Sequence, residues 1–409
     1  MKQNPNFILS KIADVPYLLP VGQAIADHKR GLKTNTTGVY LWNLLAEEHS
    51  LEEVLSLSAT HYGISANELP EFEQEITDFV RMLCSNGILT ESTKVSDTSF
   101  VFRRIETSRA AELQKSSDVP AKPQTYLLSI GGITLKLVCP EEAFPPEFAD
   151  FVINDDAANV SKACQEIILH PAIPSEVPSG DVLLHNYELN ILEQEHGYLL
   201  HFPTAKRHLE IHLDKTGSTA HCYSRPPYNA DFRYDFFHAI RLSYLYLAKQ
   251  HGMVALHSAS LLYRDKLWLF SGHSGAGKST HTNLWKELYG TPVINGDLNL
   301  LALENGQPAV HGIPWCGTSG ICDTKTYPLG GIILLKQAKE NSIEHLTPDA
   351  KHLLVSQRLI SPAWTKELWS GNAELVDTMA EQLLICRLHC TKEKEAAEVM
   401  KKEIDTTLN

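Results

Sequence analysis

Residues 267–280 read LWLFSGHSGAGKST, and this stretch decides the fold of the second half of the chain. An apolar run of strand type passes into the pattern G-x-x-x-x-G-K-[ST], whose fixed positions are Gly272, Gly277, Lys278 and Ser279. Such a loop between a strand and a helix binds phosphate, because its glycines let backbone N–H groups approach the anion and the helix start is positive. The sequence therefore predicts a P-loop, and we expect it to bind ATP with Mg²⁺.

The loop pattern assigns roles to individual side chains. Lys278 would reach the β- and γ-phosphates, and the Ser279 hydroxyl would hold Mg²⁺. Asp297 ends the next predicted strand, nineteen residues after Lys278, and would hold the metal or accept a proton. An ordinary turn aspartate after Gly296 is the alternative for that position. The predicted nucleotide-binding residues are Gly272, His273, Ser274, Gly275, Ala276, Gly277, Lys278, Ser279 and Thr280.

Strand and helix patterns alternate on both sides of the loop, as in an α/β domain. A largely apolar helix is expected over 231–252. The other expected strands are 254–263, 292–297, 330–335 and 383–390, and the other expected helices are 280–290, 347–359 and 392–404. We therefore predict a P-loop α/β core over residues 231–409.

The middle of the chain has a different pattern. Residues 125–230 are mainly β in character, with a hairpin around Gly131–Gly132. In HLEIHLD, 208–214, apolar and polar residues alternate, so Leu209, Ile211 and Leu213 would share one face. The preceding segment, 93–124, is rich in Ser, Thr, Lys and Glu and contains two prolines near its end. It is predicted to be a linker with about one pair of helical turns.

Residues 1–92 are predicted to form a small separate module of winged-helix type. Two strands with a turn near residues 14–16 precede three helices. Asn35 or Thr36 would cap the first helix. Ser50 and Glu53 would form a capping box at the start of the second, which Gly63 would end. The whole chain is thus expected to be multidomain, α+β at its front and α/β at its end.

Composition excludes several classes of protein. The chain is 43% hydrophobic and 21% charged, with a formal net charge of −13, so we expect no nucleic-acid or membrane binding. The start of the chain is polar and no stretch is long and apolar enough to span a membrane, which favours a cytoplasmic protein. The eight cysteines are scattered without C-x-x-C spacing and are expected to be reduced.

The strand carrying His257 in LHSAS, 256–260, the loop G-x-S-G-x-G-K-S-T and the acidic strand end resemble HPr kinases and their peptide-tailoring relatives. The resemblance covers about residues 125–409. It implies phosphoryl transfer, with His257 beside the γ-phosphate and catalytic roles for Lys278 and Asp297. A histidine of purely structural role is the alternative for His257.

Two departures from that family concern the acidic residues. The family has two adjacent aspartates where this chain has Gly296 and Asp297. It also has a glutamate on a later strand, and the matching segment PAVHGIPWCGTSG, 308–320, has none. His311, Trp315 and Thr318 are candidates for lining the site, and an ordinary strand and loop is the alternative.

The front module resembles PqqD proteins, which bind leader peptides of ribosomally made natural products. The matching positions are Asn35, Gly38, Trp42 and the end of the module, Leu83 with 87–89. The resemblance implies that residues about 7–90 bind a leader, with a sheet edge from 7–20 and a helical wall from 70–83. A generic module for nucleic acid or self-association is the alternative, although the acidic helices disfavour nucleic acid.

Together these features predict an ATP-dependent kinase that phosphorylates a Ser or Thr hydroxyl of a ribosomally made precursor peptide held by its leader. One alternative is ATP-dependent activation of a peptide carboxylate, which would need no proton acceptor. Another is a non-catalytic, ATP-gated peptide carrier. Homo-oligomerisation stays open, because no sequence feature decides it.

Overall fold

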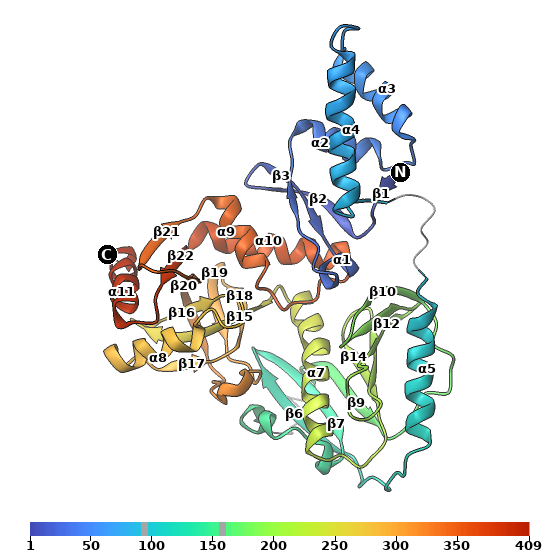
Figure 1. Cartoon of the computed structure of the whole chain (residues 1–409). Coiled ribbons are helices and arrows are strands. Elements are labelled where there is room, and N and C mark those ends of the chain that lie inside the picture. Colours follow the sequence, from blue (N-terminus) through green and yellow to red (C-terminus); the bar gives the residue numbers. More distant parts are fainter. Residues whose placement is uncertain (91–96, 155–160, 409) are drawn as a thin grey trace.

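A computed structural model describes residues 1–90, 97–154 and 161–408, so residues 93–96 of the predicted linker lie outside the described residues. Within those ranges the chain is mixed α/β, and its strands form four sheets (Figure 1). No helix in the described ranges combines the length and apolar character that crossing a membrane requires.

The front module holds a three-stranded antiparallel sheet in the order β2-β3-β4. As predicted, Asn35 caps a helix, its Oδ1 accepting from Gly38 N at 2.9 Å, and Ser50 with Glu53 forms a capping box. The strands are β1 Lys2–Gln3, β2 Phe7–Ile12, β3 Val15–Pro20, β4 Leu32–Lys33 and β5 Leu89–Thr90. The helices are α1 Gln23–Ala26, α2 Thr36–Leu44, α3 Leu51–Tyr62 and α4 Leu69–Ser85.

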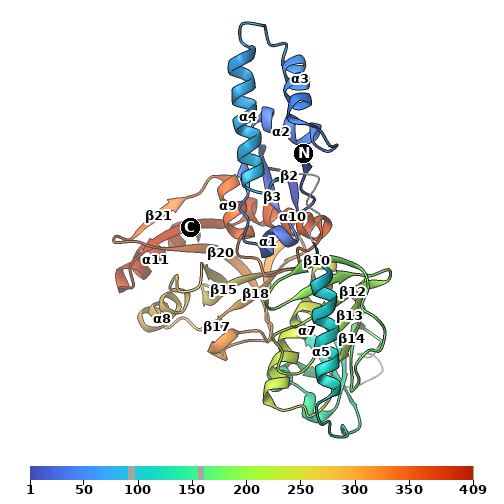
Figure 2. The same ribbon diagram turned by 45° about the vertical axis from the view of Figure 1, so that its right-hand side comes forward.

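Both faces of the β2-β3 hairpin are covered. On one face Phe7 and Leu18 pack with apolar residues of α2, α3 and α4. On the other face Ile12, Tyr17 and Leu19 meet the later helices α9 (Pro348–Ser356) and α10 (Lys366–Gln382), where the Tyr17 hydroxyl donates to Asp349 Oδ2 at 2.7 Å. The hairpin therefore packs between its own helices and the last third of the chain (Figures 1 and 2).

The middle of the chain forms a nine-stranded sheet in the order β10-β11-β12-β13-β14-β9-β7-β6-β8. The predicted hairpin is present, with Gly131 and Gly132 at positive φ between β6 and β7. The strands are β6 Gln124–Ile130, β7 Ile133–Cys139, β8 Val152–Ile153, β9 Ala163–His170, β10 Asp181–His185, β11 Asn190–Glu193, β12 Gly197–His201, β13 Glu210–Asp214 and β14 Thr219–Tyr223. Two 3₁₀ turns, η1 Glu141–Ala143 and η2 Pro146–Phe151, lie between β7 and β8.

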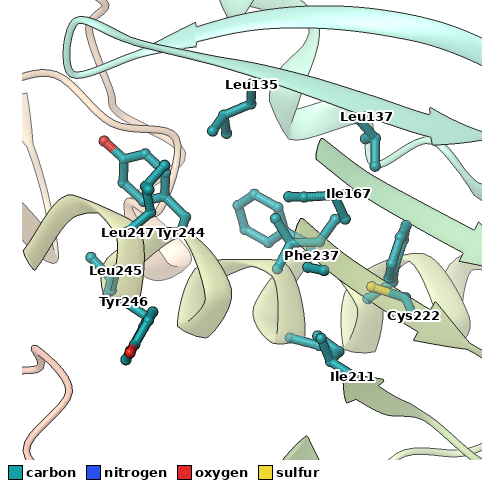
Figure 3. Close-up of a cluster of buried hydrophobic side chains, with 14 of the residues drawn as sticks. Leu135, Leu137, Ile167, Ile211, Cys222, Phe237, Tyr244, Leu245, Tyr246 and Leu247 are labelled. Atoms are coloured by element: carbon teal, nitrogen blue, oxygen red, sulfur yellow. The ribbon is translucent and has the colours of Figure 1, made fainter. Parts of the chain in front are cut away.

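Helix α7, Ala230–Gln250, covers one face of this sheet. Figure 3 shows Phe237, Tyr244 and Leu245 of α7 against Leu135 and Leu137 of β7, Ile167 of β9 and Ile211 of β13, all buried. Ile211 shares its face with Leu209 and Leu213, as predicted. The domain limit predicted at residue 230 therefore separates α7 from the sheet on which it packs.

The other face of the sheet carries a helix where the sequence analysis predicts a linker. Residues Ser99–Leu113 form α5, and that part of the linker prediction is wrong. Its buried stripe is half charged, since Val101 and Ile105 are followed by Arg109 and Glu112. The partner of Arg109 is the fully buried Glu210 of β13, at 2.7 and 2.9 Å. Because the stripe is not apolar, its hydropathy did not indicate burial.

The last body is an eight-stranded sheet in which β16 pairs with both β15 and β20. The strands β16, β15, β18, β19 and β20 therefore close into a ring. β16 pairs in parallel with β20, and β20 in parallel with β22. The strands are β15 Val254–Tyr263, β16 Lys266–Ser271, β17 Val293–Asn295, β18 Leu298–Glu304, β19 Gln307–His311, β20 Thr326–Gln337, β21 Ser342–His345 and β22 Leu384–Cys390. Helices α8 Lys278–Tyr289 and α11 Lys394–Leu408 and the turn η3 Gly317–Ser319 complete this body with α9 and α10.

Candidate functional site

The glycine-rich loop joins the end of β16 to the start of α8, the strand–loop–helix arrangement that the motif requires. Gly275 and Gly277 have φ of 77° and 106°, a backbone region that side chains disfavour. Gly272 is needed for a different reason, because a Cβ there would lie 2.7 Å from the Ala276 Cβ. The chain can therefore wrap closely around the start of α8.

The start of α8 leaves its backbone donors available. Gly277 precedes the helix, and within the described residues no side chain caps it. The first N–H groups of a helix lack internal partners, and the helix dipole adds positive potential there. From the other side, Gln337 at the end of β20 donates to the Gly275 carbonyl at 2.9 Å and anchors the loop. This arrangement suits an anionic ligand.

Three predicted catalytic residues form one hydrogen-bonded chain. Lys278 Nζ lies 2.8 Å from His257 Nε2, and His257 Nδ1 lies 3.2 Å from Asp297 Oδ1. Because an ammonium can only donate, Nε2 accepts from Lys278 and the ring hydrogen on Nδ1 points to Asp297. The bond from His257 holds the pKa of Asp297 below its usual value in spite of burial. Burial lowers the pKa of Lys278, and Asp297 partly offsets that effect.

The backbone of Asp297 is held by Asn295, a residue that the sequence analysis did not single out. Asn295 is buried, and its Oδ1 accepts from the backbone N–H groups of Asp297 and Leu298 at 2.9 and 3.1 Å. The Asp297 carbonyl accepts from Ser258 N on β15 at 2.9 Å. The spacing Asn-x-Asp within a turn is the only signal in the sequence for this role.

Gly296 has a packing reason to lack a side chain. A Cβ at this position would lie 2.2 Å from Ser319 Oγ and 2.5 Å from Ser319 Cβ. Ser319 thus occupies the space in which a second carboxylate would stand. Gly317 is equally constrained, since a Cβ there would lie 2.9 Å from Asp297 Cγ. The turn of residues 316–320 is therefore packed directly against the Asp297 side chain.

A pocket of about 420 Å³ lies beside the chain of Lys278, His257 and Asp297. It is lined by His257, Ala259, Ser274, Lys278, Ser279, Thr282, Asn283, Val293, Gly296, Asp297, Thr318, Ser319 and Ile321. Gly272, His273, Gly275, Ala276 and Gly277 form the loop next to it, and Thr280 is exposed in the first turn of α8. Five of the residues predicted for catalysis or nucleotide binding, His257, Ser274, Lys278, Ser279 and Asp297, thus meet at one pocket.

The three candidates from segment 308–320 have different positions. Thr318 lines the pocket. Trp315 instead packs in the core, where its ring stacks on Phe237 and its Nε1 donates to the Phe237 carbonyl at 3.1 Å. His311 lies away from the pocket, with its Nδ1 2.8 Å from Thr326 Oγ1. The prediction that this segment lines the site therefore holds for Thr318 and is wrong for the other two.

The donors available to a metal are few but of the right kind. Among the described residues no group of three or more His, Cys, Asp or Glu side chains could hold a metal ion. Ser279 and Asp297 both line the pocket and offer a hydroxyl and an ionised carboxylate. Mg²⁺ prefers oxygen donors and usually takes only one or two from the protein, the rest coming from phosphates and water. These residues fit Mg²⁺ held together with a nucleotide.

Comparison with known proteins gives little beyond the geometry. No protein-family model matches the chain, and no curated protein matches it. The solved structure of the Hpr(Ser) kinase/phosphatase from Coxiella burnetii matches 38% of this chain and 99% of its own, at 10% identity and a TM-score of 0.22. A likeness of that size carries no argument about activity, so both family resemblances stay predictions from the motifs.

Proposed function

We propose that this chain is an ATP-dependent phosphotransferase that phosphorylates a Ser or Thr hydroxyl of a ribosomally made precursor peptide. The observation that carries the proposal is the connected set of Lys278, His257 and Asp297 beside a glycine-rich loop and an uncapped helix start. The set joins a phosphate-binding cation to a proton acceptor, which are the two groups that such a transfer needs.

Nucleotide binding would rearrange one bond of this set. The triphosphate would lie along residues 272–280, and Lys278 would exchange His257 for the β- and γ-phosphates. Ser279 and Asp297 would hold Mg²⁺, which when bound shields the negative charge of the phosphates. Departure of the ammonium leaves the lone pair of His257 Nε2 free, while Asp297 still holds the ring through Nδ1.

The acceptor hydroxyl would then lose its proton to His257 Nε2 as its oxygen attacks the γ-phosphorus. The bond from that phosphorus to the β-γ bridging oxygen breaks, ADP leaves, and Asp297 stabilises the positive charge on the imidazole ring. A single carboxylate suffices in this scheme because the histidine takes the proton. The second aspartate of the resembled family is therefore dispensable here, in agreement with the packing of Ser319 against Gly296.

The front module would hold the leader of the peptide. Within the described residues β2 pairs only with β3, so its outer edge can accept an added strand. A hollow of about 750 Å³ between α3 and α4, lined in part by Leu55, Ile64 and Leu69, offers space for side chains. Holding the leader would raise the local concentration of the acceptor at the pocket.

The test is mass spectrometry of a candidate precursor peptide, taken from a small open reading frame beside this gene, after incubation with the protein, ATP and Mg²⁺. We expect a gain of one phosphate that is absent with the Lys278→Ala variant and stable to hydroxylamine. Loss of the phosphate to hydroxylamine would instead identify an acyl phosphate and carboxylate activation. ATP binding with no ADP formed in the presence of the peptide would contradict the kinase.

A further inference from the structure

Arg358, two residues after α9, brings a second cation to the glycine-rich loop. Its Nη2 lies 2.7 Å from His273 Nε2, and its Nη1 donates to the Gln357 carbonyl at 3.3 Å. Its Nε is buried and has no hydrogen-bond partner among the described residues. In the described ranges no carboxylate lies within ion-pair distance of this guanidinium. A half-buried charge in this state is costly unless an anion joins it.

Among the described residues, the two cations at this loop outnumber the single carboxylate that lines the pocket. The charge of Arg358 lowers the pKa of His273, whose Nε2 lies 2.7 Å from the guanidinium. Asp297, the carboxylate lining the pocket, is already bonded to His257. Lys278 at the pocket and Arg358 at His273 therefore bring two cations to the loop that precedes the uncapped start of α8.

The backbone around Arg358 is fixed to the strand that carries His257. The Arg358 carbonyl accepts from His257 N at 2.9 Å, and Ile360 N donates to the Ala255 carbonyl at 2.9 Å. A bridge between Leu256 and Leu359 lies between these two bonds. The Arg358 backbone is thus fixed, and only the Arg358 side chain needs to rotate from His273 toward a ligand.

We propose that Arg358 is a phosphate ligand, which binds the terminal phosphate of the nucleotide in exchange for His273. The inference rests on the proposed function, since it deepens the account of the same site. Arginine suits this role because its planar N–H fork pairs with two phosphate oxygens at once. The terminal phosphate is the expected partner because the Arg358 backbone is bonded to His257 N, and the His257 ring contacts Lys278, which would reach the β- and γ-phosphates.

The experiment is titration calorimetry of the full chain with MgATP and MgADP. We expect Arg358→Ala to weaken MgATP binding by about tenfold to a hundredfold, as for the loss of hydrogen bonds to a charged group, and MgADP binding by less than about threefold. Arg358→Lys should recover part of the loss. Arg358→Gln keeps a donor near His273 and serves as a second variant should the alanine variant unfold.

A matched variant separates phosphate binding from a general change of charge. Lys351→Ala removes a positive charge from α9 itself and should leave the affinity for MgATP unchanged. An equal loss of affinity in Lys351→Ala and Arg358→Ala, or no loss in Arg358→Ala, would overturn the inference. Absence of MgATP binding by the unaltered chain would overturn the proposed function as well.

Discussion

Two regions of this chain bury charged side chains, and they pair them in opposite ways. Beneath α5, Glu210 is bonded to Arg109 at 2.7 and 2.9 Å and also to His208 and His212, at 3.0 and 2.8 Å. At the glycine-rich loop, Lys278 and Arg358 each meet a histidine instead of a carboxylate. Figures 1 and 2 show α5 on the nine-stranded sheet and α8 on the other large sheet.

The contrast separates structure from function. A buried charge with all its partners in place holds two elements together and has no capacity for a ligand. A partly buried cation that lacks a counter-charge destabilises the free protein, and binding of an anion offsets that cost. Substitution in the first region should therefore reduce folding stability, and substitution in the second should reduce binding or catalysis.

The largest effect on folding is expected for Glu210→Ala. The change leaves the Arg109 guanidinium buried without its partner, which costs about 3–5 kcal/mol of unfolding free energy. Urea unfolding followed by circular dichroism measures the loss. A loss below about 1 kcal/mol would show that the network does not hold α5 to the sheet.

Asp297→Asn should show the reverse behaviour. The amide keeps the shape of the side chain but cannot support a charged His257, so phosphoryl transfer should fall by about 10²- to 10⁴-fold. The unfolding free energy should change by less than about 1 kcal/mol, because the residue lines a pocket and is not part of a closed network. Transfer is followed by ADP release with the peptide present. An Asp297→Asn variant that keeps its activity but loses folding stability would show that Asp297 has a structural and not a catalytic role.

Low pH should reduce folding stability through His201, which is fully buried near Glu210 beneath α5. Burial lowers the pKa of His201 from 6.5 to about 3. A depressed pKa means that the unfolded chain binds the proton first, so stability is complete above pH 6.5 and falls as the pH drops toward 3. Between pH 7.5 and 5.0 this residue should account for about 2 kcal/mol.

Urea unfolding at the two pH values checks this prediction with His201→Gln as the comparison. The variant lacks the titrating ring, so its stability should fall less than that of the unaltered chain over the same interval. Other histidines with lowered pKa contribute equally to both proteins and cancel. Equal pH dependence in the two proteins would rule out His201 as a source of acid sensitivity.

The smallest effect is expected where a pair is exposed. Glu166 of β9 lies 2.7 Å from Lys136 of β7, with both side chains partly open to solvent. Glu166→Ala should cost less than about 1 kcal/mol, because water screens the pair. The same urea measurement as for Glu210→Ala shows whether burial, and not the mere presence of an ion pair, decides the cost.

Much of the fold could be predicted from local patterns. The helix caps at Asn35 and Ser50, the hairpin at Gly131–Gly132 and the strand 254–263 are set by neighbouring residues, and all are present. Helix α5 was missed because Arg109 and Glu112 look exposed until Glu210 and Arg207 are seen to face them. Such pairings join residues about a hundred positions apart, which no local pattern reveals.

The part of the site that lies in the glycine-rich loop and in the elements next to it could be predicted from the sequence. Lys278, Ser279, His257 and Asp297 lie at one pocket because each sits in or beside a strand or helix next to the loop. Asn295 and Arg358 were missed, since an asparagine in a turn and an arginine after a helix are common features with no motif. In the sequence, Gly296 stands where the resembled family has an aspartate. The structure explains the glycine, because Ser319 occupies the space that a side chain there would need.

Titration calorimetry of the purified chain with ATP in magnesium buffer tests the central claim most directly. We predict saturable heat for the unaltered protein, and an affinity at least about tenfold lower for Lys278→Ala. Glu210→Gln, measured under conditions in which it is folded, should bind with unchanged affinity. No heat from the unaltered chain, or equal affinity in Lys278→Ala, would contradict the claim that this loop and its lysine bind a triphosphate.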